Sequence, residues 1–247
     1  MPRNVCVTAA DGQTGHLIAE LLLTQPFSDK VDSVTALALD PESPRAKALA
    51  HLGATVESKC DTLCLVPPAH EDKFDIAREL IVAAKEADVQ NTLLISAAGC
   101  EYADPAKQPR LREFIDLECL FMESKGDMDT AVGHSPCIIR YALLCPKLCD
   151  GDELATAASQ TLGIDLKYDE ISPSEAKKVL KAQSESDASE QEYLLEYYTL
   201  VREGKTNYIS TNAFHDVTGA HPTEPEEFFK IYKNEFKPAK RAKHNHH

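Results

Sequence analysis

Short apolar runs alternate with segments of helical periodicity over the first 146 residues. The apolar runs predict six strands, which are Asn4–Ala9, Ser33–Leu39, Ala54–Val56, Thr62–Val66, Thr92–Ser96 and Cys137–Leu144. Most segments between them have apolar residues on one helical face, and the expected helices are Thr14–Leu23, Pro44–Leu52, Lys73–Ala87 and Leu111–Met122. Strands that alternate with helices predict an α/β fold, a doubly wound and mostly parallel sheet with helices on both faces.

The second half of the chain has a mainly helical pattern. Four potential capping boxes open helical runs, and they are Asp150–Glu153, Ser172–Glu175, Ser189–Glu192 and Thr223–Glu226. Two runs carry aromatic stripes, which begin at Tyr193 and Phe228, and this spacing favours a core over a ligand pocket. We expect a first domain over residues 1–146, a small mainly helical C-terminal subdomain over 147–236 and a basic disordered tail over 237–247.

One crossover in this pattern is too short for the fold. Only Glu57–Asp61 separate the strands expected at Ala54–Val56 and Thr62–Val66, whereas a parallel crossover takes about a dozen residues. In the usual doubly wound order these strands lie about 14 Å apart sideways, and about 21 Å along the diagonal. Five residues span at most about 18 Å. Either the topology is unusual or a segment is missing, and we expect a break near residues 57–61.

Charge narrows the choice of partners. The chain has 26 basic and 40 acidic residues, which gives a net charge of −14. An acidic surface repels phosphate backbones, so we expect no direct nucleic-acid binding. No apolar run approaches the length of a membrane span, so we expect no membrane partner. The first residues carry no apolar signal stretch, which favours a cytoplasmic location.

The tail is basic, unlike the body of the chain. Its basic residues, with no acid among them, are Lys237, Lys240, Arg241 and Lys243. A nuclear-localisation patch would extend the expected location to the nucleus, but a solubilising terminus is the favoured interpretation.

The eight cysteines include two Cys-x3-Cys pairs, Cys60 with Cys64 and Cys145 with Cys149. A zinc site takes more closely spaced pairs in a polar loop. Most of the cysteines lie in apolar runs, where a thiol behaves as a small hydrophobic group. We therefore expect reduced, buried thiols and no metal site.

The segment between the first strand and the first helix carries the main chemical signal. Its pattern is Ala-x-x-Gly-x-x-Gly, from Ala9 through Gly12 to Gly15. Gly12 would let the backbone approach a pyrophosphate, Gly15 would let the helix pack on the strand, and the helix N-terminus offers N–H groups to phosphate. In this strand and helix context the pattern predicts a Rossmann-like, dinucleotide-binding domain, with a tight turn without a ligand as the alternative. The expected loop contacts are Ala9, Asp11, Gly12, Gln13, Thr14 and Gly15.

Further cofactor contacts are expected at the ends of later strands. Asp40 follows the second strand, where a carboxylate can accept ribose hydroxyls, although a turn-forming Asp-Pro is an equal alternative. Pro67 and Pro68 would line the adenine–ribose side. Ser96 and Ala97 end a strand at the carboxyl edge of the sheet and would face the nicotinamide.

The form of the cofactor stays open at this point. Asp40 would repel a 2′-phosphate, whereas Arg45 or Lys47 could still reach one. We therefore expect NAD(P) as the cofactor.

Several further motifs accompany the loop, and they are Ala46-Lys-Ala-Leu-x-x-Leu-Gly53-Ala, Leu65-Val-Pro-Pro68, Leu93-Leu-Ile-Ser-Ala-Ala-Gly99, Pro146-Lys-Leu with the run from Glu153 to Tyr168, and Gly219…Pro222…Phe228. Together, in this order, they resemble the NmrA-like family of the atypical short-chain dehydrogenase/reductase superfamily. The resemblance covers most of the chain. It implies several tens of residues, absent here, between Leu144 and Pro146, so we expect a second break near residues 144–147.

The resemblance also implies groups that this sequence lacks. Related enzymes use Tyr-x-x-x-Lys, or a lysine on the helix that here is Leu111–Met122, and this segment has no lysine. Tyr102 and Lys107 are five positions apart around Asp104-Pro105, so they do not share a helical face. Relatives that bind NADP carry arginine where Leu39 stands. We assign no catalytic residue.

Three functional hypotheses remain from the sequence. The first, implied by the resemblance to regulators of nitrogen-metabolite repression, is an NAD(P)-binding redox sensor with a transcription regulator as protein partner. The second is an NAD(P)H-dependent reductase of a small carbonyl or quinone. The third is a scaffold without a ligand.

Overall fold

The computed structural model describes residues 3–24, 27–55, 60–124, 135–139, 149–183, 188–206, 215, 219–234 and 236. The chain forms two compact units, one of residues 1–140 with 173–206 and one of residues 141–172 with 207–247. The boundary expected between residues 146 and 147 falls outside the described residues and stays a prediction, as does the tail over 237–247.

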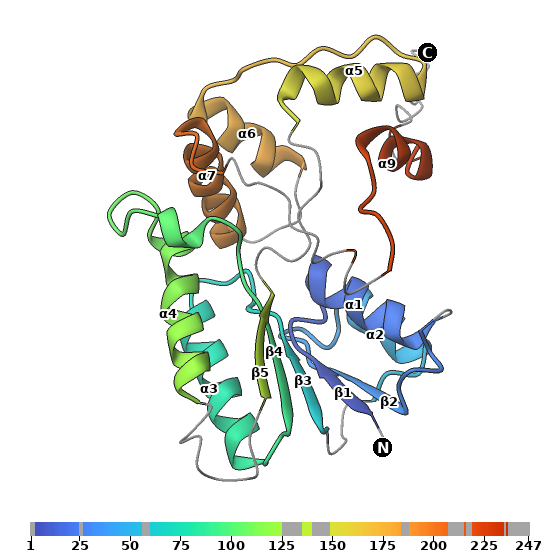
Figure 1. Ribbon diagram of the computed structural model, residues 1–247, viewed down its shortest axis with the longest axis vertical. Helices are drawn as coiled ribbons and strands as arrows, with labels where there is room; N and C mark the ends of the chain where they lie inside the picture. The colour runs from blue at the N-terminus through green and yellow to red at the C-terminus, as the bar shows by residue number, and fades with distance from the viewer. Residues whose placement is uncertain are drawn as a thin grey trace, which may run out of the picture. The chain divides into compact units, whose positions relative to one another are not determined.

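Each unit has its own set of elements (Figure 1). The strands of the first unit are β1 (Asn4–Val7), β2 (Ser33–Ala36), β3 (Thr62–Leu65), β4 (Asn91–Ile95) and β5 (Ser135–Ile139). Its helices are α1 (Gln13–Leu23), α2 (Pro44–His51), α3 (Lys73–Glu86), the short 3-10 helix η1 (Cys100–Tyr102), α4 (Pro109–Glu123), α6 (Pro173–Gln183) and α7 (Ala188–Arg202). The second unit has α5 (Gly151–Leu162) and α9 (Pro225–Ile231).

The five strands form one parallel sheet in the order β2-β1-β3-β4-β5. This confirms the α/β, Rossmann-like doubly wound fold. The chain leaves β1 toward β2 and returns to the other side of β1 for β3, so the order reverses between β1 and β3. In sheets of this kind, ligands bind at the carboxyl ends of the strands beside such a reversal.

The strand expected at Ala54–Val56 is reduced to one parallel bridge, between Thr55 and Thr35 of β2. Thr55 therefore lies at the outer edge of β2, and β3 lies beyond β1. Residues 56–59 are outside the described residues, so the break expected near residues 57–61 stays a prediction. The break expected near 144–147 also lies outside them.

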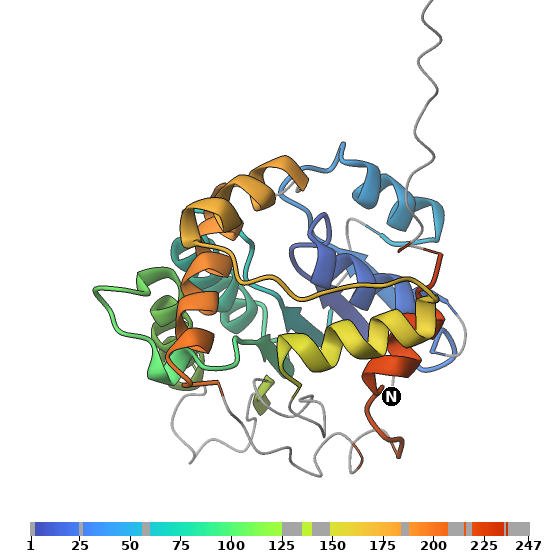
Figure 2. The ribbon, with the colours of Figure 1, turned by 90° about the horizontal axis from the view of Figure 1, so that it is seen from above.

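The core has one layer on each face of the sheet, because successive strand residues point to opposite faces. Leu63 and Leu65 of β3 face one cluster, together with Ile81 of α3 and Phe121 of α4. The cluster on the other face includes Val7 and Val34 of the sheet, Cys64 of β3, Ala19 of α1 and Leu49 of α2. Figures 1 and 2 show α3 and α4 on one face and α1 and α2 on the other.

Some of the helix N-termini have the side-chain caps that the sequence predicts, and one does not. The Ser43 hydroxyl accepts a hydrogen bond from the Ala46 N–H at 3.2 Å and caps α2. Asp150 and Glu153 form the expected capping box of α5. The box expected at Thr223 is wrong, because α9 begins at Pro225 after the extended residue Glu224, with no side-chain cap. The fixed φ of proline favours the first helical position.

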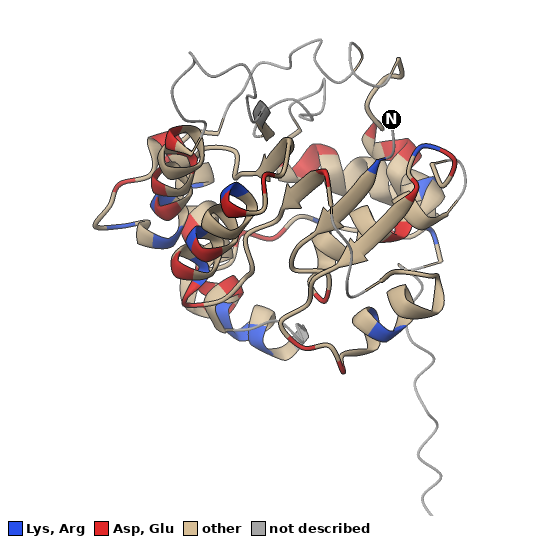
Figure 3. Ribbon diagram, turned by 90° about the horizontal axis from the view of Figure 1, so that it is seen from below, with Lys and Arg blue, Asp and Glu red and all other residues tan. Residues whose placement is uncertain are grey.

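Charged residues lie mostly on the helices and connections, and the strands carry few (Figure 3). Within the described part of the chain, no helix is both long and apolar enough to cross a membrane.

Thr8 ties the end of β1 to the end of β3. Its buried hydroxyl donates to the Val66 carbonyl and accepts from the Val66 N–H, both at 2.8 Å.

We expect Thr8→Val to lower the free energy of unfolding by about 2 kcal/mol, because two buried backbone groups lose their partner. Urea denaturation measures this. The exposed Thr156→Val is the control, and an equal, small effect of both changes would contradict the prediction.

Candidate functional site

The connection from β1 to α1 forms a tight loop. The Gly12 N–H donates to the Ala9 carbonyl at 3.0 Å, and the His16 N–H donates to the Gly12 carbonyl at 3.2 Å. No side chain caps the helix, whose N-cap residue is Gly12. The first-turn N–H groups therefore remain available for an anion at the carboxyl edge of the sheet.

Ala9 has the backbone conformation that a glycine would adopt at this point. Its φ is +47°, in the left-handed region. This conformation costs an L-residue about 1 kcal/mol. The alanine at the first motif position therefore does not prevent the loop from forming.

Gly15 marks the closest approach of α1 to this loop. A Cβ atom on Gly15 would lie 2.2 Å from the Ala9 carbonyl oxygen and 2.5 Å from that of Thr8. A Cβ on Gly12 would lie 3.2 Å from the Ala9 carbonyl oxygen. Only glycine fits at position 15 without displacing backbone.

We expect Gly15→Ala to destabilise the chain by about 2–3 kcal/mol, because the new methyl group overlaps two carbonyl oxygens. Gly12→Ala should cost clearly less, since its contact is only slightly too short. Urea denaturation of both variants provides the comparison, and a larger loss for Gly12→Ala would contradict the geometry.

The segment after β2 meets the loop. The Asp11 carboxylate accepts the Asp40 N–H at 2.9 Å, and Arg45 Nη1 donates to the Asp11 carbonyl at 3.3 Å. The Asp40 carboxylate accepts the Glu42 N–H at 2.9 Å, so Asp40 forms the turn considered as its alternative role. Lys47 pairs with Glu42 at 2.8 Å. Arg45 is therefore the cation of this segment that contacts the loop.

A cavity of about 150 Å³ lies where β1, β2 and β3 end. Its lining is mostly apolar and consists of Thr8, Ala9, Leu37, Ala38, Leu39, Val66, Pro68, Ile76 and Leu80. Such a lining suits a flat apolar group with few polar contacts.

A second cavity, of about 200 Å³, lies where β3 and β4 end. Its lining includes five of the residues expected from the sequence, which are Thr14, Pro67, Pro68, Ser96 and Ala97. Pro68 and Val66 line both cavities. Of the other expected residues, Ala9 lines the first cavity, and Asp11, Gly12, Gln13, Gly15 and Asp40 lie in or beside the loop without lining either cavity.

The second cavity also has residues that the sequence did not single out as site residues. They are Ala69, His70 and Lys73 near the start of α3, Ile95 of β4, Arg110 and Phe114 of α4, and Ser189, Glu190 and Tyr193 of α7. Three of them belonged to patterns noted in the sequence for other reasons: Ile95 to a family motif, Ser189 to a capping box, and Tyr193 to the aromatic stripe attributed to the core. Tyr193 is the one considered there as a possible ligand contact. It packs against the cluster around Leu111 and Leu200 and lines the cavity as well.

Lys73 is a buried cation in this wall. Its Nζ donates to the Arg110 carbonyl at 2.6 Å, lies 3.2 Å from Glu113 Oε2 and lies 4.1 Å from the centre of the Phe114 ring. Burial lowers the pKa of Lys73, and the Glu113 carboxylate opposes this shift. The ammonium group therefore holds α3 against α4 and gives the wall a positive charge.

The N-terminal part of α7 is attached to α4 by polar contacts. Arg110 Nη1 donates to the Ser189 hydroxyl, and the Glu196 carboxylate accepts the Leu111 N–H at 2.9 Å. Burial raises the pKa of Glu196, and this hydrogen bond opposes the shift. These contacts place Tyr193 on the cavity wall.

Phe114 and Tyr193 form the aromatic part of the wall, with ring centres 5.8 Å apart. Burial raises the pKa of the Tyr193 phenol to about 12. The phenol therefore keeps its proton at neutral pH and can donate a hydrogen bond to a ligand.

Ser96 has a buried acidic partner. Its hydroxyl donates to Glu118 Oε1 of α4 at 2.5 Å, and Cys100 Sγ lies 3.8 Å from the same oxygen. Ser96 thus belongs both to the cavity lining and to a polar cluster behind it.

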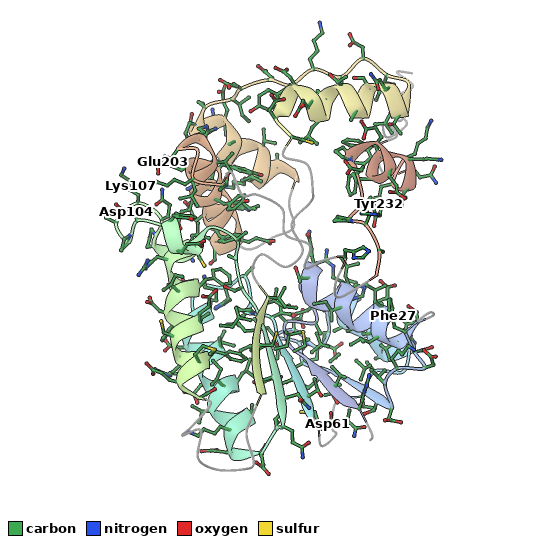
Figure 4. The ribbon with its side chains drawn as sticks, viewed as in Figure 1. Phe27, Asp61, Asp104, Lys107, Glu203 and Tyr232 are labelled. Carbon is green, nitrogen blue, oxygen red and sulfur yellow. The ribbon has the colours of Figure 1, made fainter. Side chains whose placement is uncertain are left out.

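Tyr102 and Lys107 lie away from both cavity linings. The Tyr102 side chain is half exposed, and Lys107 Nζ lies 3.7 Å from Glu203 (Figure 4). The described residues include no group of acids, histidines and cysteines able to hold a metal ion. Of the cysteines in the described ranges, Cys6, Cys64 and Cys100 are buried, and Cys119 and Cys137 are exposed.

No family model and no curated protein matches this sequence. Solved structures do share its fold. An NADPH-dependent quinone oxidoreductase from Escherichia coli, complexed with NADPH, has a TM-score of 0.65 at 18% identity over 92% of this chain and 99% of its own. The triphenylmethane reductase of Citrobacter sp., complexed with NADP(H), has a TM-score of 0.65 at 16% identity over 90% and 98%.

Leucoanthocyanidin reductase from Vitis vinifera has a TM-score of 0.62 at 14% identity, over 94% of this chain and 99% of its own. At such low identities these likenesses establish a common fold, and what the chain binds has to be argued from its own residues.

Proposed function

We propose that the chain binds NAD(P) along the carboxyl edge of its sheet. The observation that carries this proposal is the position of the Ala9–Gly15 loop, because Ala9 lines the first cavity and Thr14 lines the second, whose wall includes charged and hydroxyl side chains. A dinucleotide has the same order of parts, with an adenine whose flat faces are apolar, a central pyrophosphate, and a nicotinamide that carries a polar carboxamide. Three solved structures with this fold are reductases, and two of them hold NADPH or NADP(H).

Each part of the cofactor then has residues to hold it. The adenine would occupy the cavity between Leu39 and Ile76, and the pyrophosphate would bind the first-turn N–H groups of α1. The nicotinamide would occupy the cavity beside Pro67 and Ser96. These residues fit the group, because apolar walls meet the base and unused donors meet the phosphates.

We further propose that the chain is an NAD(P)H-dependent reductase of a small carbonyl or quinone. When bound, the reduced dinucleotide supplies a hydride. Phe114 and Tyr193 offer a flat aromatic wall to a planar substrate. The Tyr193 phenol, protonated at neutral pH, would donate a hydrogen bond to the substrate oxygen.

One observation favours a second function. Helix α4 has no lysine, and Tyr102 and Lys107 line neither cavity, so the Tyr-x-x-x-Lys pattern of related enzymes has no counterpart there. The NmrA-like resemblance would then describe a redox sensor in the cytoplasm or nucleus, which binds NAD(P) and a transcription regulator. Membership of that family stays a proposal.

Calorimetric titration with NAD⁺, NADH, NADP⁺ and NADPH tests the shared premise. We expect saturable binding of at least one form, and NADPH consumption with some members of a carbonyl and quinone panel. Binding without consumption would contradict the reductase and favour the sensor. If no form binds, dinucleotide binding is wrong and the scaffold remains.

Arg45 should set the preference for the phosphorylated cofactor, since it is the cation of the β2–α2 segment that contacts the loop. We expect Arg45→Gln to weaken NADPH binding about tenfold and to leave NADH binding nearly unchanged, because one charge-assisted contact to the 2′-phosphate is lost. Calorimetric titration with NADPH and with NADH measures the ratio of the two dissociation constants. Lys47→Gln is the matched control, since Lys47 pairs with Glu42. An equal loss for both cofactors would contradict this role of Arg45.

A further inference from the structure

Behind the wall of the second cavity, a buried carboxylate accepts a hydrogen bond from the hydroxyl group of Ser96. Glu118 lies in α4 with 6% of its surface exposed. Its Oε1 is 2.5 Å from Ser96 Oγ and 3.8 Å from Cys100 Sγ. Ser96 lines the cavity from the end of β4.

The direction of the hydrogen bond follows from the chemistry of the two groups. The Ser96 hydroxyl donates to Glu118 Oε1, and Glu118 does not line the cavity, so the Ser96 proton points away from the cavity. Cys100 Sγ also lies 4.0 Å from Ser96 Oγ and can use one of its lone pairs. The other lone pair is then the polar feature that Ser96 offers to a ligand. A carboxylate beside a partly buried hydroxyl fixes this orientation more firmly than a neutral partner would.

We propose that Ser96, oriented by Glu118, is an acceptor site for an N–H group of the ligand, and that this group is the carboxamide of the nicotinamide. The proposal rests on the proposed cofactor. Ser96 would touch the ligand, and Glu118 is a positioning residue that acts through Ser96.

The part of the second cavity beside Ser96 should distinguish a carboxamide from the corresponding carboxylate. A primary amide brings two N–H donors and pairs with this Ser96 lone pair. A carboxylate brings acceptors only, and it would also face the negative charge of Glu118 in a partly buried place. Lys73 and Arg110 line the same cavity, but Lys73 Nζ is paired with Glu113 at 3.2 Å and Arg110 donates to the Ser189 hydroxyl. Beside Ser96 the cavity should therefore favour a carboxamide over a carboxylate.

The test compares the affinities of the full-length protein for NADP⁺ and for its deamido analogue, which has a carboxylate in place of the carboxamide. The unmodified protein should bind NADP⁺ at least tenfold more tightly. Ser96→Ala and Glu118→Gln should reduce this ratio to about twofold. The first removes the acceptor, and the second removes the charge and lets the Ser96 proton turn toward the cavity.

Two variants separate this role from general damage. Glu123→Gln changes an exposed acid of the same helix and should keep the full ratio. Ser96→Thr keeps the hydroxyl group and should keep the full affinity ratio that Ser96→Ala loses. The test therefore remains decisive even if Glu118→Gln does not fold.

The outcomes distinguish this inference from the proposed function. If neither dinucleotide binds, the proposed cofactor is wrong and the inference fails with it. If NADP⁺ binds but the unmodified protein shows no preference, or if Ser96→Ala keeps the full preference, cofactor binding stands and the acceptor role of Ser96 is overturned.

Discussion

The close packing of α1 on the end of β1 is the constraint on which the candidate site depends. Gly15 brings the helix against the carbonyl groups of Thr8 and Ala9, and the Thr8 hydroxyl joins β1 to Val66 beyond β3. The first-turn N–H groups therefore stand at the point where the strand order reverses. Because each of these contacts is backbone or buried, the position of the helix end is fixed before any ligand arrives.

The two cavities follow from that constraint. The loop occupies the space above β1, so room remains on its two sides, one beside β2 and one beside β4. Apolar residues of α3 cover the first side, where Ile76 contributes to the lining. Lys73 at the start of α3 and charged and aromatic residues of α4 and α7 cover the second, where Lys73 Nζ contacts the Arg110 carbonyl and the Phe114 ring. The difference in polarity thus comes from the side chains that cover each side.

The sequence predicts the fold, and it names the loop and strand-end residues of the candidate site, because strands, helices and the glycine loop are local patterns. It could not supply the α7 side of the second cavity. Ser189 contacts Arg110 from 79 positions away, a distance in sequence that no local pattern bridges. The stripe containing Tyr193 was attributed to the core, and the residue does pack there, since one side chain can bury one face and present another to a cavity. Lys73 resembles an ordinary first-turn residue until tertiary packing buries it.

Helix α4 influences the second cavity through its buried polar side chain, Glu118. Glu118 is buried where an apolar residue would pack at lower cost, and a buried carboxylate persists only when it is well hydrogen-bonded. Its bond to Ser96 reaches the cavity, whereas the exposed acids of the same helix contribute charge to the surface only. A helix that has neither a tyrosine nor a lysine can still determine which polar groups a ligand meets. In this chain it does so through the orientation of a hydroxyl group and not through a titrating donor of its own.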